Sequence, residues 1–203
     1  MDEEKKRILT EFKKLGESTK DLKNFLEMKE YKDLCNYYYP IYGLDSYNIE
    51  QEAIATIISE VEGIYVKGNI IEIMQHANYT YILVAYDYIC IDPHTVLTII
   101  VKNKDKKYLE GIRPQDGVKV YLDFEYIPDK HIEIYATKIV KMDKMRFPIK
   151  ICPICKQIYD RRDDEHFCQF SSTLCDFCST DKDPVSLVEV DNTDDLYAII
   201  DSE

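Results

Sequence analysis

The sequence has no run of about eighteen apolar residues free of charge, the length that would read as a membrane-spanning helix. It also has no N-terminal segment that is first charged and then apolar, as a secretory signal would be. From these two absences we expect an intracellular protein without a membrane span. The 203 residues are 45% apolar, which is enough for one or two compact domains and a further small module.

Common catalytic signatures are absent as well. The sequence contains no phosphate-binding loop, no nucleophile elbow, no His-Glu-x-x-His helix and no evident pair of catalytic carboxylates. Each of these patterns places reactive groups in a geometry that its chemistry requires. We therefore predict that the protein is not an enzyme.

Cysteine, in contrast, is well represented, and four of the seven cysteines form two Cys-x-x-Cys pairs. Each short turn lets two sulfurs converge, and two such pairs separated by nineteen residues are typical of a tetrahedral Zn²⁺ site. Thiols in this pattern suit a reducing compartment better than a disulfide framework does. Redox chemistry at the first pair is the alternative, but it leaves the second pair without a role. The sequence predicts one structural zinc ion held by Cys152, Cys155, Cys175 and Cys178.

Two further candidate ligands, His166 and Cys168, lie between the pairs. Five cysteines and one histidine cannot fill two tetrahedral sites, and a RING-type module with two zinc ions needs eight ligands. We therefore expect His166 and Cys168 to stay outside the set of ligands. The remaining cysteines, Cys35 and Cys90, lie among apolar residues and are interpreted as buried thiols.

The net charge of −12 is distributed unevenly along the chain. Residues 181–203 hold eight acidic side chains and one lysine, and they are interpreted as an acidic tail. Residues 61–150 hold thirteen basic and twelve acidic side chains, so this is the one region that is not acidic. A surface that attracts a polyanion is expected there.

Residues 1–60 are predicted to form a helical region. Apolar residues recur at helical spacing, so that one stripe of the surface carries Ile8, Phe12, Leu15, Leu22 and Leu26. This stripe either packs on the chain's own core or docks on a partner subunit. The aromatic stretch 37–43, which contains proline and glycine, is interpreted as a connector, and residues 49–60 as a short helix.

From about residue 61 the apolar period changes to two, which indicates β-strands. Gly68 interrupts the first strand, and a bend there would let one strand serve both ends of a small barrel. Residues 104–112 can form a helical turn between the third and fourth strands. Five strands in this order predict an OB-fold barrel. The strands are expected at residues 63–75, 79–91, 95–102, 117–127 and 131–141.

The predicted fold class is mainly β with N-terminal helices. The helical region at 1–60 is followed by an OB-fold domain at 61–145, a zinc ribbon at 146–180 and the acidic tail at 181–203. Within the OB-fold domain, residues 111–122 (GIRPQDGVKVYL) and 131–139 (HIEIYATKI) resemble the last two strands of OB-folds in the replication protein A class of single-stranded DNA-binding proteins.

This resemblance covers about residues 61–141. Members of the class commonly carry zinc ribbons, which agrees with the cysteine pairs, although here the ribbon follows the barrel. The resemblance implies a non-catalytic protein that binds single-stranded nucleic acid in replication, recombination or repair, in the nucleus or in the nucleoid and cytoplasm. DNA is the expected ligand, and RNA is the alternative.

A barrel with this role needs aromatic rings on which bases stack and cations that contact phosphates. Strand alternation turns the apolar residues inward and their neighbours outward. The acidic residues Asp123, Glu125 and Glu133 alternate onto the outward side as well and oppose binding. The candidate nucleic-acid-binding residues are Tyr65, Lys67, Tyr79, Tyr81, Lys102, Lys104, Lys106, Lys107, Lys119, Tyr121 and Tyr135.

The alternative function is that of an adaptor or assembly subunit in a replication, repair, telomere or transcription complex, with an OB-fold that binds protein. Protein partners are expected at the acidic tail or at the N-terminal helix. The tail ends in DDLYAIIDSE at residues 194–203, which resembles the partner-recruiting ends of bacterial single-stranded DNA-binding proteins. Alternatively, the end of the tail forms a last helix or strand that packs its apolar side chains against the rest of the protein. These side chains are Leu196, Tyr197, Ile199 and Ile200.

Overall fold

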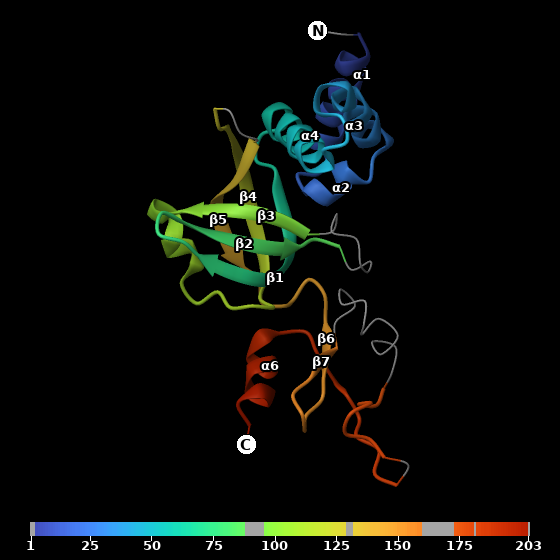
Figure 1. Ribbon diagram of the computed structural model, residues 1–203, viewed down its shortest axis with the longest axis vertical. Coiled ribbons are helices and arrows are strands. Elements are labelled where there is room, and N and C mark those ends of the chain that lie inside the picture. Colours follow the sequence, from blue (N-terminus) through green and yellow to red (C-terminus); the bar gives the residue numbers. More distant parts are fainter. Residues whose placement is uncertain (1–2, 88–95, 129–131, 160–172, 181, 203) are drawn as a thin grey trace.

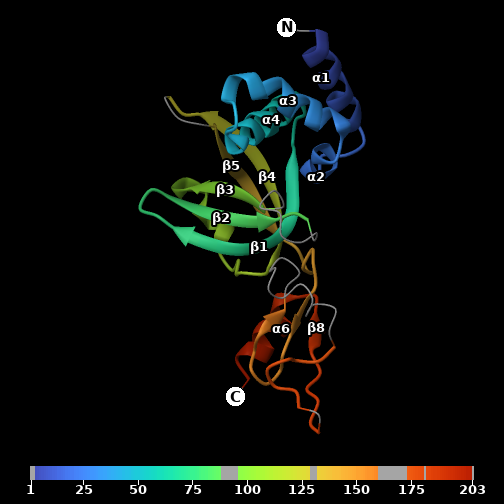
Figure 2. The same ribbon diagram turned by 45° about the vertical axis from the view of Figure 1, so that its right-hand side comes forward.

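A computed structural model describes residues 3–87, 96–128, 132–159, 173–180 and 182–202. Helices lie over one end of a β-barrel, and a small C-terminal module lies at its other end (Figures 1 and 2). The two termini are therefore at opposite ends of the molecule. Within the described residues, no helix is both long and apolar enough to cross a membrane.

The N-terminal helices share one hydrophobic core with the barrel. Ile8, Phe12 and Leu22 are fully buried in this core, together with barrel residues such as Val66 and Ile82. The predicted stripe therefore packs on the chain's own core, so these side chains are not available to dock a partner. The helices are α1 (Glu3–Gly16), α2 (Leu22–Leu26), α3 (Lys29–Tyr42) and α4 (Ser46–Glu60).

The aromatic stretch predicted to be a connector is helical, because α3 continues to Tyr42 with Pro40 inside it. Proline lacks an amide proton, so α3 loses one backbone hydrogen bond at Pro40, and the helix ends two residues later, before Gly43, whose φ is 63°. The buried hydroxyl of Tyr38 is 2.8 Å from the Thr56 hydroxyl on α4. Tertiary packing of this kind overrides the local turn signals on which the connector was predicted.

The predicted OB barrel is confirmed. Five strands close in the order β1-β2-β3-β5-β4, and the short 3₁₀ helix η2 (Asn103–Leu109) lies between β3 and β4 in the chain. The bounds of four strands agree with the expected ones to within two residues, whereas β2 ends at Ala85 and was expected to continue to residue 91, of which residues 88–91 lie outside the described residues. The strands are β1 (Tyr65–Gln75), β2 (Tyr79–Ala85), β3 (Val96–Lys102), β4 (Gly117–Tyr126) and β5 (Ile132–Lys141).

Strand β1 serves two partners, as the glycine in its middle predicted. Residues 65–69 pair with β4 and residues 69–75 with β2, so that Asn69 lies opposite both Gly117 and Ala85. A Cβ atom on Gly68 would lie 2.0 Å from the carbonyl oxygen of Ala85, so the close approach of the two backbones requires glycine. The register irregularity falls slightly later, between Ile70 and Glu72.

The C-terminal module combines a three-stranded sheet, in the order β7-β6-β8, with helix α6 (Thr193–Ile200). Its strands are β6 (Ile149–Ile151), β7 (Ile158–Tyr159) and β8 (Val188–Val190). Leu196 on α6 is 1% exposed and packs on Met145, Ile149 and Val190. Of the two alternatives for the end of the chain, the structure therefore shows the packed one over the described residues 194–202, where the apolar side chains of α6 pack on the module.

Buried hydrogen bonds join the module to the barrel. The Asn69 side chain is 0% exposed, and its amide group donates to the Phe147 carbonyl oxygen at 2.8 Å. Its Oδ1 atom accepts from the backbone amides of Arg146 and Phe147 at 2.7 and 3.1 Å. The chain that leaves β5 is thus held against β1 before it enters β6.

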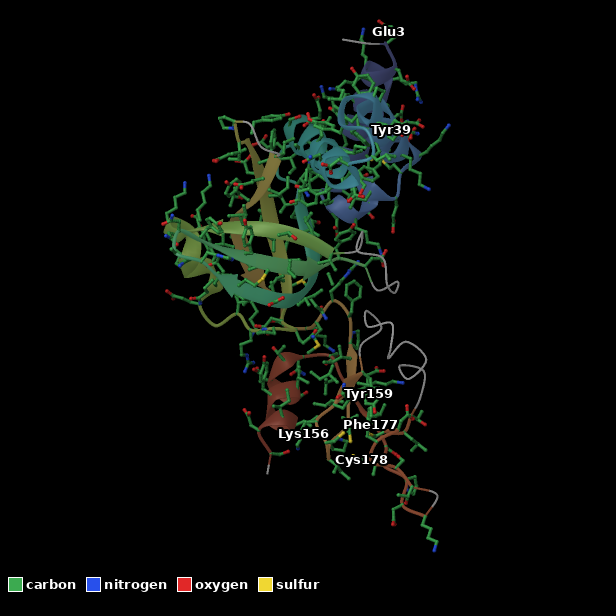
Figure 3. The ribbon with its side chains drawn as sticks, viewed as in Figure 1. Glu3, Tyr39, Lys156, Tyr159, Phe177 and Cys178 are labelled. Carbon is green, nitrogen blue, oxygen red and sulfur yellow. The ribbon has the colours of Figure 1, made fainter. Side chains whose placement is uncertain are left out.

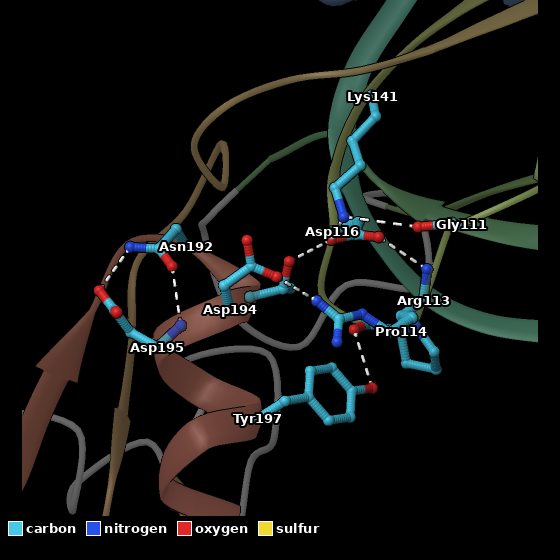
Figure 4. Close-up of polar contacts among 10 residues, drawn as sticks. Gly111, Arg113, Pro114, Asp116, Lys141, Asn192, Asp194, Asp195 and Tyr197 are labelled. Carbon is cyan, nitrogen blue, oxygen red and sulfur yellow. Dashed lines mark hydrogen bonds and ion pairs between the residues drawn. The ribbon is translucent and has the colours of Figure 1, made fainter.

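Asp116, just before β4, makes the second connection (Figure 4). This carboxylate is 0% exposed, forms an ion pair with Lys141 Nζ at 2.9 Å and accepts from the Arg113 amide at 2.7 Å. It also accepts a hydrogen bond from the hydroxyl of Thr193, the first residue of α6. Helix α6 is therefore attached to the barrel at its N-terminus through a buried charge.

Candidate metal centre and nucleic-acid interface

The four cysteines predicted as metal ligands lie together at the far end of the module. Their Sγ atoms are all within 4.8 Å of one another, and the Sγ atoms of Cys155 and Cys175 are 3.7 Å apart. A tetrahedral site with metal–sulfur distances of about 2.3 Å places neighbouring sulfurs about 3.8 Å apart. The four side chains therefore fit one tetrahedral metal ion.

The first pair of cysteines lies on the turn between β6 and β7. The amides of Ile154 and Cys155 point at the Sγ atom of Cys152, at 3.4 and 3.5 Å. Lys156 has a φ of 61°, which turns the chain back so that the Cys152 amide donates to the Gln157 carbonyl oxygen at 3.0 Å. This turn brings both sulfurs to the same side and offers amide protons to a thiolate.

Tyr159 on β7 supports the second pair, and the sequence analysis did not single it out. Its hydroxyl donates to the Sγ atom of Cys175 at 3.2 Å, and both residues are 0% exposed. Burial by itself raises the pKa of a thiol, but hydrogen bonds from Tyr159 and from the amides of Cys178 and Phe177 lower the pKa of Cys175 to about 6. The thiolate is the form that binds a metal. The signal in the sequence was a polar aromatic residue four positions after the first pair.

The four cysteines differ in their exposure to solvent. Cys152 and Cys175 are buried, whereas Cys155 is exposed and Cys178 is half-buried. Figure 3 shows Tyr159, Phe177 and Cys178 near one another in the module. His166 and Cys168, predicted to be bystanders, and Cys90 lie outside the described residues.

On the barrel, one group of predicted residues spans β1 and β4 and is completed by a lysine on β5. Tyr65 lies opposite Tyr121, and Lys67 lies opposite Lys119, in the β1–β4 register. Tyr121 in turn lies opposite Lys138 on β5. The two tyrosine rings meet edge to face, with 5.8 Å between their centroids. We call these five residues the β1–β4–β5 cluster.

Positive charge converges on the two rings of this cluster. Lys119 Nζ is 3.7 Å from the Tyr65 ring centroid and 4.8 Å from that of Tyr121. Lys67 Nζ is 5.5 Å from the Tyr65 centroid, and Lys138 Nζ is 5.8 Å from the Tyr121 centroid. A hydrogen bond with Lys119 lowers the pKa of Tyr121, and the charges of all three lysines act in the same direction.

Lys138 was missed for a specific reason. Because Ile132, Ile134 and Ala136 point inward, strict alternation would turn residue 138 inward too. However, the β4–β5 register shifts between Tyr121 and Leu122, so that β5 contributes one extra residue at Thr137. Thr137 and Lys138 are therefore both exposed.

A second group lies on β2, β3 and β5, and we call it the β2–β3–β5 cluster: Tyr79, Tyr81, Lys102 and Tyr135. The rings of Tyr79 and Tyr81 are 4.9 Å apart between centroids, and the His76 ring lies 5.3 Å from each of them. Lys102 lies opposite Tyr79 in the β2–β3 register, and its Nζ is 4.0 Å from the Tyr135 ring centroid. These residues flank the turn between β1 and β2, where OB-folds usually bind their ligands.

Acidic side chains form an ion pair and a hydrogen bond with residues of the β2–β3–β5 cluster. Lys102 forms an ion pair with Glu125, and the Tyr135 hydroxyl donates to Glu133. Burial raises the pKa of Tyr135, and its hydrogen bond to Glu133 acts in the same direction. Tyr135 points outward as expected, but it is only 9% exposed. Its ring is thus covered, and Lys102 is neutralised locally.

The lysine run after β3 lies on η2. Lys104 and Lys107 are exposed and Lys106 is half-buried, while Lys107 Nζ is 5.1 Å from the Tyr108 ring centroid. Asp105 lies in the first turn of the same helix. The predicted nucleic-acid-binding residues are therefore divided among two clusters on the barrel and this short helix.

No model of a protein family and no curated protein matches the chain. Solved structures that are similar include the Schizosaccharomyces pombe Stn1–Ten1 complex, with 17% identity, a TM-score of 0.31 and coverage of 38% of this chain and 56% of that one. S. pombe Pot1pC bound to single-stranded DNA shows 12% identity and a TM-score of 0.30, over 40% of this chain and 78% of that one. A putative aspartyl-tRNA synthetase from Leishmania major shows 9% identity and a TM-score of 0.29, over 39% and 17%. The chain thus spans little more than half of the Stn1–Ten1 chain, and conclusions about function rest on the geometry.

Proposed function

We propose that the protein is a non-catalytic single-stranded nucleic-acid-binding protein whose barrel is the binding surface. DNA is the expected ligand and RNA the alternative, and the process is replication, recombination or repair, in the nucleus or nucleoid. The observation that carries the proposal is the outward array of tyrosine rings with lysine ammonium groups over them, such as Lys119 over Tyr65. Stacking contributes about 1–3 kcal/mol per base without regard to sequence, and lysines release counterions from phosphates.

We further propose that the metal is one structural Zn²⁺ ion, held by Cys152, Cys155, Cys175 and Cys178. Four thiolates in tetrahedral arrangement are soft ligands of the kind that zinc prefers. A site filled by four protein ligands leaves no open position for an activated water, which supports a role in folding and not in catalysis.

A second candidate function is that of an adaptor or assembly subunit of a replication, repair, telomere or transcription complex. It is favoured by a different surface, at the tips of the two cysteine turns. Ile154 and Phe177 each precede the second cysteine of a pair, and their exposed fractions are 64% and 68%. Each turn thus presents a large apolar side chain to solvent, as surfaces that contact protein often do.

The proposed function is tested by titrating fluorescent 20-nucleotide DNA and RNA strands, and the duplex of the same sequence, with the full chain at about 50 and 200 mM salt. We expect binding to single strands that weakens with salt, and weaker binding to the duplex, whose bases are not free to stack. If the chain binds neither DNA nor RNA at the lower salt concentration, the proposed function is wrong and the adaptor function is the remaining candidate. The full chain is required because a truncation before residue 182 would remove β8 and α6 from the folded module.

A further inference from the structure

We propose that the phosphates of a single strand bind the β1–β4–β5 cluster, and not the β2–β3 face and loops that OB-folds commonly use. This inference rests on the proposed function and states where on the barrel the strand lies. Its basis is the juxtaposition of Lys67, Lys119 and Lys138 around Tyr65 and Tyr121.

The lysines of this cluster have no acidic partner within the part of the chain that the structure describes. Among the residues that the structure describes, no ion pair joins Lys67, Lys119 or Lys138 to an acidic side chain. In the β2–β3–β5 cluster, by comparison, a phosphate would have to displace Glu125 from Lys102 and would approach Glu133. A polyanion is therefore attracted to the β1–β4–β5 cluster and repelled by the acidic side chains of the β2–β3–β5 cluster.

Two acidic residues lie at the rim of the cluster. Asp21 bridges to Tyr65 through the backbone, but its carboxylate caps α2 by accepting from the Lys23 amide at 3.4 Å. Asp123 lies farther along β4, opposite Tyr135, at the edge of the second cluster. The backbone of Lys20 accepts from the Tyr65 amide at 2.9 Å, which brings a further lysine to the rim.

The two tyrosines offer the faces that bases need. Both are half-buried, which fixes their rings while leaving part of each accessible. A base stacks on an aromatic face at least as strongly as an exposed ammonium group does, so a base can take the place of a lysine over the ring. The displaced ammonium then remains close enough to contact the adjoining phosphate.

The lysines form a row across the barrel surface. Lys67, Lys119 and Lys138 lie on three adjacent strands, which are about 4.8 Å apart. Lys138 lies opposite Tyr121, two residues along β4 from Lys119, so the row is staggered and about 12 Å long. A row of this length suits a short stretch of backbone that crosses the strands. If each lysine contacts one phosphate, the logarithm of the binding constant should fall with the logarithm of salt concentration at a slope of about −2.

The test compares two triple variants that remove equal charge from exposed or half-buried positions. We expect Lys67→Gln, Lys119→Gln and Lys138→Gln together to weaken binding of a 20-nucleotide DNA more than tenfold at about 50 mM salt and to bring the slope close to zero. The matched variant, Lys104→Gln, Lys106→Gln and Lys107→Gln on η2, should weaken binding less than threefold. Circular dichroism melting checks that both variants fold.

A separate double variant, Tyr65→Leu and Tyr121→Leu, should weaken binding while leaving the salt slope unchanged, because it removes stacking and no cation. If the η2 variant loses more affinity than the β1–β4–β5 variant, the inference is wrong while the proposed function stands. If the unaltered chain binds no strand at all, the proposed function itself is wrong.

Poly-L-glutamate serves as a second probe of the cluster. If the chain binds poly-L-glutamate as tightly as it binds DNA, the cluster receives an acidic protein segment instead of a nucleic acid.

Discussion

Replacement of Cys152 by serine is expected to abolish stoichiometric zinc binding and to unfold the C-terminal module while the barrel stays folded. In small zinc modules the metal-binding free energy of about 10–16 kcal/mol is largely folding free energy. Here the only fully buried residues in the described core around the cysteines are Cys152, Cys175 and Tyr159, with Val185 and Leu187 partly buried against them, which is too few to hold the two turns without a metal. Zinc content by mass spectrometry and hydrogen exchange over residues 149–200 measure the two effects.

The matched control is Cys35→Ser on α3, which changes a half-buried thiol outside the cluster. This variant should keep one equivalent of zinc and native exchange in the module. If Cys152→Ser also retained a full equivalent of zinc, the four-cysteine site would be assigned incorrectly.

Replacement of Asp116 by alanine is expected to lower the free energy of unfolding by about 2–4 kcal/mol, because it leaves two donors of this buried carboxylate, the Arg113 amide and the Thr193 hydroxyl, without their acceptor. The side chain is 0% exposed and has partners in the barrel and in α6. Without it, Lys141 loses its buried counter-ion, and the Thr193 hydroxyl and the Arg113 amide lose their acceptor. Urea unfolding followed by circular dichroism measures the change.

Asp194→Ala provides the comparison at the same junction. Asp194 forms an ion pair with Arg113 at 2.6 Å, but its side chain is 88% exposed, so the expected loss is at most about 1 kcal/mol. Equal losses in the two variants would mean that the buried carboxylate of Asp116 does not connect the barrel to the module as described.

The connections at Asn69 and Asp116 also relate the metal site to the barrel. Both side chains are fully buried and both bind backbone or side-chain groups of the module. Unfolding of the module therefore removes hydrogen-bond partners from the barrel surface, and we expect some increase in exchange near these two residues in Cys152→Ser. A metal ion bound by the four cysteines would therefore stabilise the position of the module as well as its fold.

Features governed by local rules were predictable. The alternation of apolar residues located all five strands, and Gly68 marked the position where β1 changes partner, because no Cβ atom fits there. The cysteine pairs likewise indicated four sulfurs around one point, since Cys-x-x-Cys spacing determines the turn geometry within each pair. In both cases the signal and the structural constraint lie within a few residues of each other.

Features that depend on distant neighbours were not predictable in the same way. Helix α3 continues through Pro40 because Tyr38 and its neighbours pack on α1 and α4. The outward direction of Lys138 depends on a register shift between two strands, and the local pattern of β5 does not reveal it. Similarly, only the fold shows that Glu125 pairs with Lys102 and that Glu133 accepts from Tyr135 in the β2–β3–β5 cluster. The lysines of the β1–β4–β5 cluster have no such partners among the described residues.

The central claim, that the barrel surface binds a single strand, is tested most directly by photo-crosslinking. A DNA strand that contains 4-thiothymidine is irradiated with the full chain, and the modified peptides are identified by mass spectrometry. We predict crosslinks in peptides that contain Tyr65 or Tyr121, which unlabelled single-stranded DNA suppresses. Absence of crosslinks to the barrel, or crosslinks confined to residues 149–200, would contradict the claim.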